Sequence, residues 1–419
     1  MTYPNQSETP AQRIMDGARQ AFLAFGYDGA AMRTITEYTG YSQAGISHYF
    51  ASKADLFSAV AEESFREVER AFALDGNSDP ITSIFKIWRS LTRIRDHVAM
   101  RTVTIAEASV AGHPARDQAI ASIHHMRDSL AARFPEIDHI DVFADIFRGL
   151  EKNWLYDAYL DGASILKDAY LALSGSSAKT AEPLTPDEIS DDWEPEFEHL
   201  IDPFIDHDLD AHLEDERRQS ILGAAMKVFG MRGYVGGSLR HIANELGVTH
   251  PALLRHYPSK DTLFRAVLER HDVGISPPRK SKGPRQALLR HIQRCIALED
   301  VEGLIPLYTA IDARSFLPGT SYHDFFVKQG RQLMAVENHV FTGIHAIGQL
   351  RPDLNPLRQA EAYQALWDGV QTRWALHETE STYRPLSIYV DRILVPRLGN
   401  EELSTVKLTR EDLHEASRK

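Results

Sequence analysis

The stretch from Ser220 to Val267 reads SILGAAMKVFGMRGYVGGSLRHIANELGVTHPALLRHYPSKDTLFRAV. It decides the fold because residues 13–60 repeat it without a gap, 207 positions earlier. Identical pairs include Phe22/Phe229, Gly26/Gly233, Tyr27/Tyr234, Arg33/Arg240, Ile35/Ile242, Gly40/Gly247, Ser52/Ser259, Lys53/Lys260, Leu56/Leu263 and Phe57/Phe264. A repeat with a period of this length indicates a duplicated domain rather than a solenoid.

The pattern within each copy predicts short helices. Apolar residues recur at i, i+4, i+7 and i+8, in the second copy as Ile221, Ala225, Val228 and Phe229. Gly233, like Gly26, is expected to end this helix in the left-handed conformation. Gly247 suits a sharp turn after a second helix, and Thr249, like Ser42, is a good N-cap for a third. Three short helices with a glycine turn before the last predict a helix-turn-helix, whose final helix fits the major groove of DNA.

Both copies resemble the DNA-binding domain of the TetR family of bacterial transcriptional regulators. The resemblance lies in the run VTHPALLRHYPSK at residues 248–260 and in YSQAGISHYFASK at residues 41–53. More than a hundred residues with helical patterns follow each copy. We therefore expect an all-α protein with two TetR-like units in tandem, each with an N-terminal head and a larger helical body for ligand binding and dimerisation.

The expected organisation has seven parts. They are a disordered arm (1–10), a first head (11–60), a first body (61–174), an acidic linker (175–214), a second head (215–267), a second body (268–400) and a charged tail (401–419). The offset between the copies grows to 220 at Gly149 and Gly369. We expect the additional residues in the basic, proline-rich loop from Pro277 to Pro284.

The net charge of −13 is compatible with DNA binding because it is concentrated in the linker. Residues 175–214 contain thirteen Asp and Glu against one Lys. The first head, residues 11–60, has four basic and four acidic residues, whereas residues 215–267 have eight basic and four acidic ones. Since affinity for the DNA backbone depends on local positive charge, the second head is expected to hold DNA better.

The resemblance implies a set of DNA-contacting residues in each head. In the first head they are Arg33, Ser42, Gln43, Ser47, His48, Tyr49 and Lys53; in the second they are Arg240, Thr249, His250, Arg255, His256 and Lys260. Arg255 suits bidentate contact with guanine and Gln43 suits adenine. Lys53 and Lys260 are expected to clamp phosphates, and the remaining residues suit phosphate or base contacts.

Both copies depart from the family pattern. Ser47 and Leu254 stand where an aromatic residue is usual, and Pro251 replaces a small residue. The first copy has Ala30-Ala31 where the second keeps Ser238, a capping residue. These departures motivate an alternative hypothesis, a helical sensor or interaction protein in which only the second head binds DNA.

The resemblance also implies a double-stranded operator, a small-molecule effector and pairing through the last two helices of each body. In a tandem chain this pairing predicts a covalent pseudo-dimer, with residues 143–154 facing residues 363–374 and two unlike half-sites on the operator. A dimer of tandem chains is the competing architecture. The ligand candidates are Trp88, Trp154, Tyr308 and Trp367, with His97, His124, Phe316, Phe326 and His377 as further possibilities.

Other functional classes find little support in the sequence. No enzyme motif is present, no histidine spacing fits a metal site, and no cofactor is expected. The single cysteine, Cys295, lies among apolar residues and is expected to be a packed thiol. No run approaches the length of a membrane span and the N-terminus has no signal-peptide core, so we expect no membrane association and a cytoplasmic location.

Overall fold

The computed structural model describes residues 9–73, 78–110, 112–175, 216–275, 284–301, 303–320 and 322–395. The predicted arm (except its last two residues), the linker beyond Gly175, the basic loop up to residue 283 and the tail lie outside these residues. The regular secondary structure of the described residues is helical, apart from an isolated bridge between Leu350 and Leu394. The prediction of an all-α fold is confirmed.

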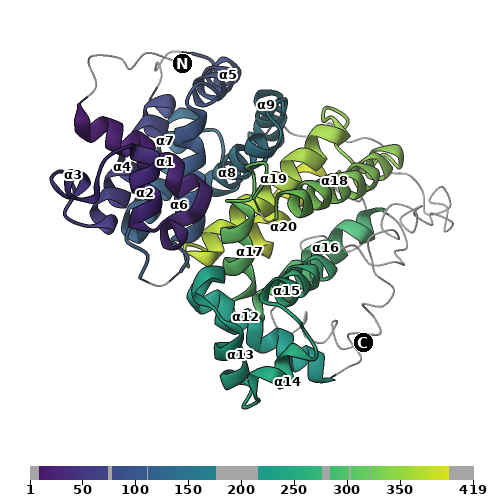
Figure 1. The fold of residues 1–419 in the computed structure, drawn as a ribbon. Coiled ribbons are helices and arrows are strands. Elements are labelled where there is room, and N and C mark those ends of the chain that lie inside the picture. Colours follow the sequence, from purple (N-terminus) through teal and green to yellow (C-terminus); the bar gives the residue numbers. More distant parts are fainter. Residues whose placement is uncertain are drawn as a thin grey trace.

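The helices occur in two consecutive sets (Figure 1). The first unit has a head of α1 (Pro10–Gly29), α2 (Met32–Thr39), α3 (Gln43–Ser47) and α4 (Lys53–Phe72), and a body of α5 (Pro80–Leu91), α6 (Arg95–Glu107), α7 (Arg116–Arg133), α8 (Ile140–Tyr156) and α9 (Gly162–Leu173). The second has α12 (Glu216–Gly236), α13 (Leu239–Glu245), α14 (His250–Leu254) and α15 (Lys260–Ile275), then α16 (Pro284–Glu299), α17 (Leu304–Asp312), α18 (His323–Ala346), α19 (Pro356–Ala375) and α20 (Tyr383–Ile393).

Glycines and caps delimit the helices of the heads. Gly26, Gly40 and Gly247 adopt φ values of +69°, +71° and +64°, which favour glycine. The predicted helix ends at Gly26 and Gly233 are wrong in position, because α1 kinks at Gly26 and runs on to Gly29, and α12 runs on to Gly236. The N-terminus of α2 has no side-chain cap, whereas Ser238 accepts a hydrogen bond from His241 N at the start of α13.

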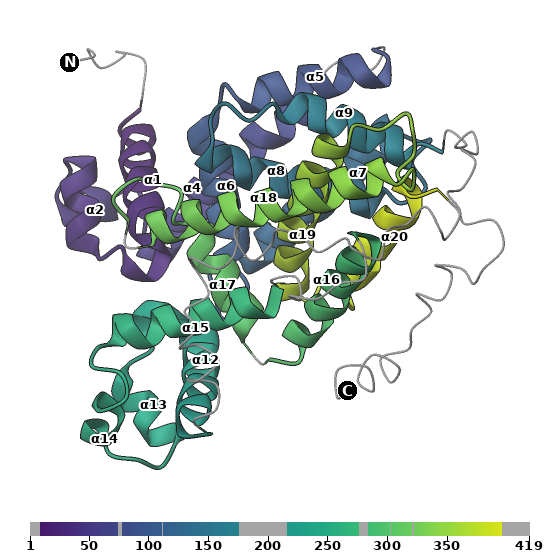
Figure 2. The ribbon, with the colours of Figure 1, turned by 90° about the vertical axis from the view of Figure 1, so that its right-hand side faces the viewer.

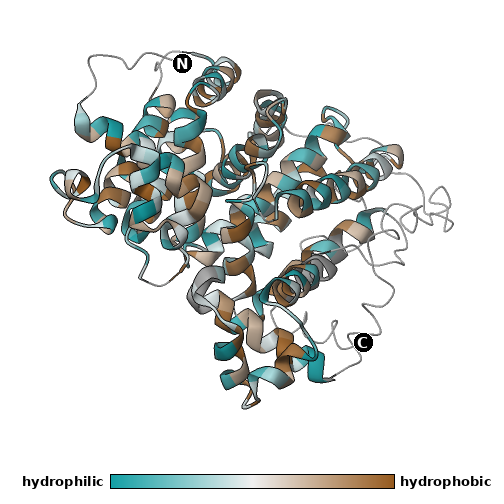
Figure 3. Cartoon of the chain, in the orientation of Figure 1, coloured by the Kyte–Doolittle hydropathy of each residue, from teal (hydrophilic) through white to brown (hydrophobic). Residues whose placement is uncertain are grey.

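Each head has a small aromatic core. Phe22 and Phe57 pack edge to face with ring centroids 4.8 Å apart, and Phe229 and Phe264 repeat the contact at 5.2 Å. All four rings are fully buried. Figure 3 shows hydrophobic residues where helices face one another and hydrophilic residues on their outer sides. The repeated sequence therefore builds the same core twice.

The two bodies meet where α8 crosses α19. A Cβ atom added to Gly149 would lie 1.8 Å from the carbonyl oxygen of Ala365, and one added to Gly369 would lie 1.9 Å from that of Asp145. The backbones of the two helices are therefore in direct contact, and the contact is symmetric. Helices α9 and α20 complete the bundle by packing against α19 and α8. The two predicted stripes, residues 143–154 and 363–374, lie on these crossing helices.

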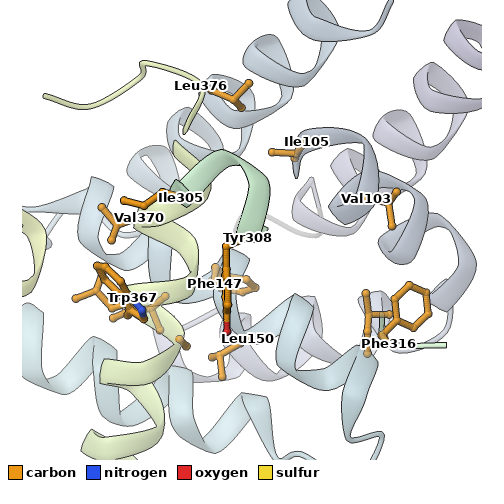
Figure 4. Close-up of a cluster of buried hydrophobic side chains, with 14 of the residues drawn as sticks. Val103, Ile105, Phe147, Leu150, Ile305, Tyr308, Phe316, Trp367, Val370 and Leu376 are labelled. Carbon is orange, nitrogen blue, oxygen red and sulfur yellow. The ribbon is translucent and has the colours of Figure 1, made fainter. Parts of the chain in front are cut away.

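The apolar core is continuous across this crossing. Figure 4 shows side chains from both units around Tyr308, with Phe147 and Leu150 from α8 and Trp367 from α19. These four residues are buried. A core shared in this way makes each body depend on the other for its stability, since the apolar area between them is removed from water only when both are folded.

The extra residues of the second body are not where the sequence predicted them. Helix α16 begins 204 positions after α5, fewer than the 207 positions that separate the two heads. The loop before α16 therefore contributes no additional residues to the second copy. Helix α18 has 24 residues where α7 has 18, and the connection to the next helix has nine residues where the first unit has six. The last four additional residues lie at the start of α19, because Gly369 is its fourteenth residue whereas Gly149 is the tenth of α8. The assignment of the insertion to Pro277–Pro284 is therefore corrected: it lengthens the wall of the second body.

Buried charges also join the units. Lys152 of α8 forms ion pairs with Asp312 (2.5 Å) and Asp368 (2.8 Å), both in the second unit. In return, Arg373 of α19 pairs with Asp145 of α8 at 2.6 Å. These groups are largely or fully excluded from solvent, and removing one member of such a cluster would leave an uncompensated buried charge.

Each head rests on its own body through a tyrosine. Tyr27 packs its ring 5.5 Å from His113, and Tyr234 packs 6.0 Å from Tyr322. Both contacts are edge to face, a favourable geometry for aromatic rings. The duplicated head is thus seated on a different side chain in each unit.

The first head also touches the second body. Arg314, just after α17, lies 3.2 Å from Glu107 Oε1 and donates to the carbonyl oxygen of Phe25 (3.3 Å). Glu107 in turn accepts a hydrogen bond from Tyr27 N (3.0 Å). Burial raises the pKa of Glu107, but His113, the Arg314 charge and the Tyr27 amide outweigh it and hold that pKa below the usual value. Figure 2 shows both heads on the same side of the bodies.

Candidate nucleic-acid interface

The predicted recognition helix of the first head, α3, is a single capped turn. Ser42 Oγ accepts a hydrogen bond from Gly45 N (3.1 Å), and Ile46 is buried beneath the helix. The predicted contact residues Gln43, Ser47, His48 and Tyr49 are exposed. The His48 and Tyr49 rings lie edge to face, 4.9 Å apart. The structure therefore brings the predicted polar set together on one accessible surface.

The predicted recognition helix of the second head, α14, has the same construction. Thr249 Oγ1 accepts from Ala252 N (3.3 Å), Pro251 occupies the first turn and Leu253 is buried. Proline is tolerated there because its missing N–H has no partner within the helix. Arg255 is exposed, and His250 and His256 are half-buried. A guanidinium, an imidazole and a hydroxyl thus flank one short helix.

The two predicted phosphate-clamp lysines are held by their own heads. Lys53 Nζ donates to the carbonyl oxygens of Tyr27 (2.8 Å) and Ala30 (3.4 Å) and lies 4.4 Å from the Tyr27 ring centroid. Lys260 Nζ lies 4.2 Å from the Tyr234 ring centroid. Burial lowers the pKa of Lys260, against the opposing charge of Asp261. Each lysine therefore joins two helices of its head, a role that the sequence analysis missed although both pairs belong to the repeat.

The arginines near the second helix are more accessible. The side chain of Arg33 is 90 % exposed and pairs with Glu37 at 3.2 Å, one helical turn away. Arg240 is also exposed. Surface ion pairs of this kind contribute little to stability, about 0.2–1 kcal/mol, so Arg33 can exchange its partner for a phosphate at small cost.

The second body contains a cavity of about 570 Å³. Tyr308 and Trp367, two of the four leading ligand candidates, line it, and so does Phe326. Its wall includes Lys152 and Tyr156, which come from α8 of the first unit. Trp88 and Trp154 instead pack against each other in the core of the first body, with ring centroids 6.3 Å apart.

The other possible ligand residues are placed elsewhere. His97 lies 3.3 Å from Ser64 Oγ, His124 pairs with Glu378 at 2.6 Å, and Phe316 is buried. His377 has a φ of +62°, the one positive value among the described residues other than glycine. The cavity-lining acid Glu337 was missed, although its sequence context carries a signal: an acid at an apolar position of the α18 pattern, between Leu333 and Phe341.

The described residues lack two kinds of feature. Among them, no group of three or more His, Cys, Asp and Glu side chains is arranged to hold a metal ion. No helix within the described ranges combines the length and the apolar character needed to cross a membrane. Cys295 is buried, as predicted for a packed thiol.

One family model matches both heads, and several known proteins are similar to parts of the chain. Residues 14–60 and 221–267 match the family model for bacterial regulatory proteins of the tetR family. The transcriptional repressor AcnR of Corynebacterium glutamicum is 38 % identical over 65 residues, 16 % of this chain and 35 % of the relative. The transcriptional activator FasR of Mycolicibacterium smegmatis is 47 % identical over 74 residues, 18 % of this chain and 32 % of the relative. The chain thus spans about a third of the length of these relatives.

Longer matches extend beyond a head. The transcriptional repressor KstR of Rhodococcus jostii is 25 % identical over 181 residues, which cover 42 % of this chain and 80 % of the relative. A solved structure of a transcriptional regulator from Rhodococcus sp. RHA1 is 18 % identical, with a TM-score of 0.33, and covers 40 % of this chain and 95 % of its own. The three relatives named above are transcription regulators, and none of them is named as an enzyme.

Proposed function

We propose, from the premise that this chain carries two TetR-family units in tandem, that it is a ligand-responsive, DNA-binding transcriptional regulator and acts as a repressor. One chain acts as a covalent pseudo-dimer. Its heads, residues 11–60 and 215–267, read two half-sites of double-stranded DNA, and its bodies, residues 61–174 and 268–400, hold the heads and bind a small-molecule effector.

The observation that carries this proposal is the placement of the two recognition helices. Helices α3 and α14 expose polar side chains, and their heads lie on the same side of the bodies. The direct backbone contact between α8 and α19 supports a fixed spacing between the heads. Two heads held in this way suit successive major grooves on one face of a duplex.

The half-sites are unlike because the heads are unlike. The first head presents Gln43 for adenine, and the second presents Arg255 for guanine. Arg33, Arg240, Ser42 and Thr249 lie near these helices, where phosphate contacts position the protein without reading sequence. Lys53 and Lys260 act on phosphates from their tyrosine-bound positions.

Footprinting on DNA next to the coding region of this chain tests the proposal. The wild-type chain is expected to protect two stretches about one helical turn or more apart. Gln43→Ala should remove protection from one stretch, and Arg255→Ala should remove it from the other. Each substitution is expected to weaken binding to its half-site by about 1–3 kcal/mol, the free energy of the lost base contact. Loss of both stretches in either variant would contradict independent reading of two half-sites.

A second candidate function is a helical sensor in which only the second head binds DNA. The absence of net charge in residues 11–60 and the uncapped start of α2 favour it. It predicts a single protected stretch that Gln43→Ala leaves unchanged. Light scattering on the free chain separates the two assemblies, because a pseudo-dimer has the mass of one chain and a dimer of tandem chains has twice that mass.

A further inference from the structure

We propose that the cavity of the second body binds an apolar molecule with a basic amine, and that Glu337 is the anionic partner of the amine. This inference rests on the proposed function, because it names the chemical class of the effector. It concerns one cavity per chain, whose wall is shared between the two units.

The cavity has the size and lining of a small-molecule site. Its volume of about 570 Å³ lies within the range of such sites, roughly 300–1,000 Å³. Phe326, Leu333 and Trp367 provide apolar surface, and α8 of the first unit closes one side. A small apolar recess of about 20 Å³, lined in part by Phe341, lies against the same stretch of α18.

Glu337 lines both the cavity and the recess. The residue is only 7 % exposed, and among the described residues its Oε2 atom has no hydrogen-bond partner. A buried polar group without a partner is costly to a fold, by about 1–3 kcal/mol or more for a charged group. A ligand that supplies a donor at this point removes that cost.

The charges around the cavity favour a cation. Asp312 and Asp368 share the single buried ammonium of Lys152, so acid remains in excess on the inner wall. Asp157, Glu361, Arg331 and His291 also line the cavity. Carboxylates outnumber the cations on this wall, so a carboxylate or phosphate ligand would be repelled.

The raised pKa of Glu337 fits a site in which the ammonium group of a ligand replaces the proton on this carboxyl. Burial, followed by the charge of Asp368, raises the pKa of Glu337 well above its usual value. A raised pKa favours the protonated form of this carboxyl where no cation is paired with it. An ammonium group that forms an ion pair with the carboxylate takes the place of that proton.

The first body fills the corresponding place with its own side chains. Leu130 stands 207 positions before Glu337 and is fully buried. Arg101 stands 207 positions before Tyr308; it donates to Ser122 Oγ (3.2 Å) and forms a buried ion pair with Glu151. The first unit thus carries an internal cation where the second unit has a cavity, which supports an external cation in the second.

Three probes of one shape and different charge test the proposal. They are 4-phenylbutylamine, 4-phenylbutanol and 4-phenylbutyrate, titrated into the full chain at pH 7 by calorimetry. We expect the amine to bind one site per chain at least about tenfold more tightly than the carboxylate, the equivalent of about 1.4 kcal/mol. Quenching of tryptophan fluorescence by the amine, lost in Trp367→Phe, would locate the site.

Variants of Glu337 complete the test. Glu337→Gln keeps the shape and should abolish the preference for the amine over the alcohol, and Glu337→Leu reproduces the first unit. Asp324→Asn is the matched control, because that carboxylate lies on the same helix but is exposed and does not line the cavity. The proposal is overturned if the carboxylate binds as tightly as the amine, or if Glu337→Gln and Asp324→Asn behave alike.

A DNA-binding measurement on the same samples separates this proposal from the proposed function. Amine binding that depends on Glu337 but leaves DNA affinity unchanged would support the site and contradict its effector role. DNA binding by a chain that shows no preference for the amine would overturn the site alone.

Discussion

Substitution of Gly149 by alanine is expected to separate the two crossing helices. The added Cβ atom would lie 1.8 Å from the Ala365 carbonyl oxygen, a backbone atom that cannot rotate away. Ordinary contact requires roughly 1.5 Å more, so α8 and α19 must move apart and lose close packing on both sides of the crossing. Overpacking of this kind costs about 1–3 kcal/mol and occasionally more. We expect about 3 kcal/mol, because the obstacle is backbone.

Thermal unfolding followed by far-UV circular dichroism measures this effect. For a domain of 150–250 residues each kcal/mol lowers the melting temperature by roughly 2–4 °C, so a loss of about 5 °C or more is expected here. Gly223→Ala is the matched control, because a Cβ atom there meets nothing within 4 Å. That change in a helix should stabilise by about 0.4–1 kcal/mol. If Gly149→Ala and Gly223→Ala melt alike, the direct backbone crossing is incorrect.

Two further predictions concern the charges between the units. Lys152→Met should lower the free energy of unfolding, measured by urea titration, by about 3–5 kcal/mol, because two buried aspartates lose their partner. Lys227→Met is the control: it removes an exposed ion pair and should lower the free energy of unfolding by less than about 1 kcal/mol. Glu107 has a lowered pKa, so its carboxylate stabilises the fold above the usual Glu pKa of about 4.3 and loses this contribution as the pH falls through the lowered value. The melting temperature of the wild type should therefore exceed that of Glu107→Gln between pH 6 and 8 and approach it below about pH 4; a constant difference across this range would contradict the ion pair with Arg314.

Local sequence was sufficient to predict the heads. Glycines with positive φ, side-chain caps and apolar spacing act over a few residues, so Gly26, Gly40 and Thr249 could be interpreted without knowing the rest of the chain. The missing cap of α2 was also evident from Ala31. The accessible polar sets on α3 and α14 follow from the same periodicity.

Long-range features were harder to predict. The position of the extra residues depends on the lengths of α18 and of its connection to α19, and the spacing of apolar residues does not show where such a helix ends. The binding of Lys53 by Tyr27 joins residues 26 positions apart, and no local rule indicates it. Of the aromatic ligand candidates, Trp154 lies in the core and Trp367 lines the cavity. Their spacing along the sequence is the same kind of helical stripe, so it could not distinguish the two.

Because α8 and α19 cross within one polypeptide, the pairing of the two bodies does not depend on protein concentration. A pair of separate subunits comes apart on dilution, and its half-occupied forms accumulate when few copies are present. Here the partner helix is always present at the concentration that chain connectivity provides, independent of the number of molecules. The two bodies of one chain pair with each other in this bundle and do not exchange with those of a mutant chain. A mutant allele therefore cannot inactivate the wild-type protein by forming mixed dimers through this bundle.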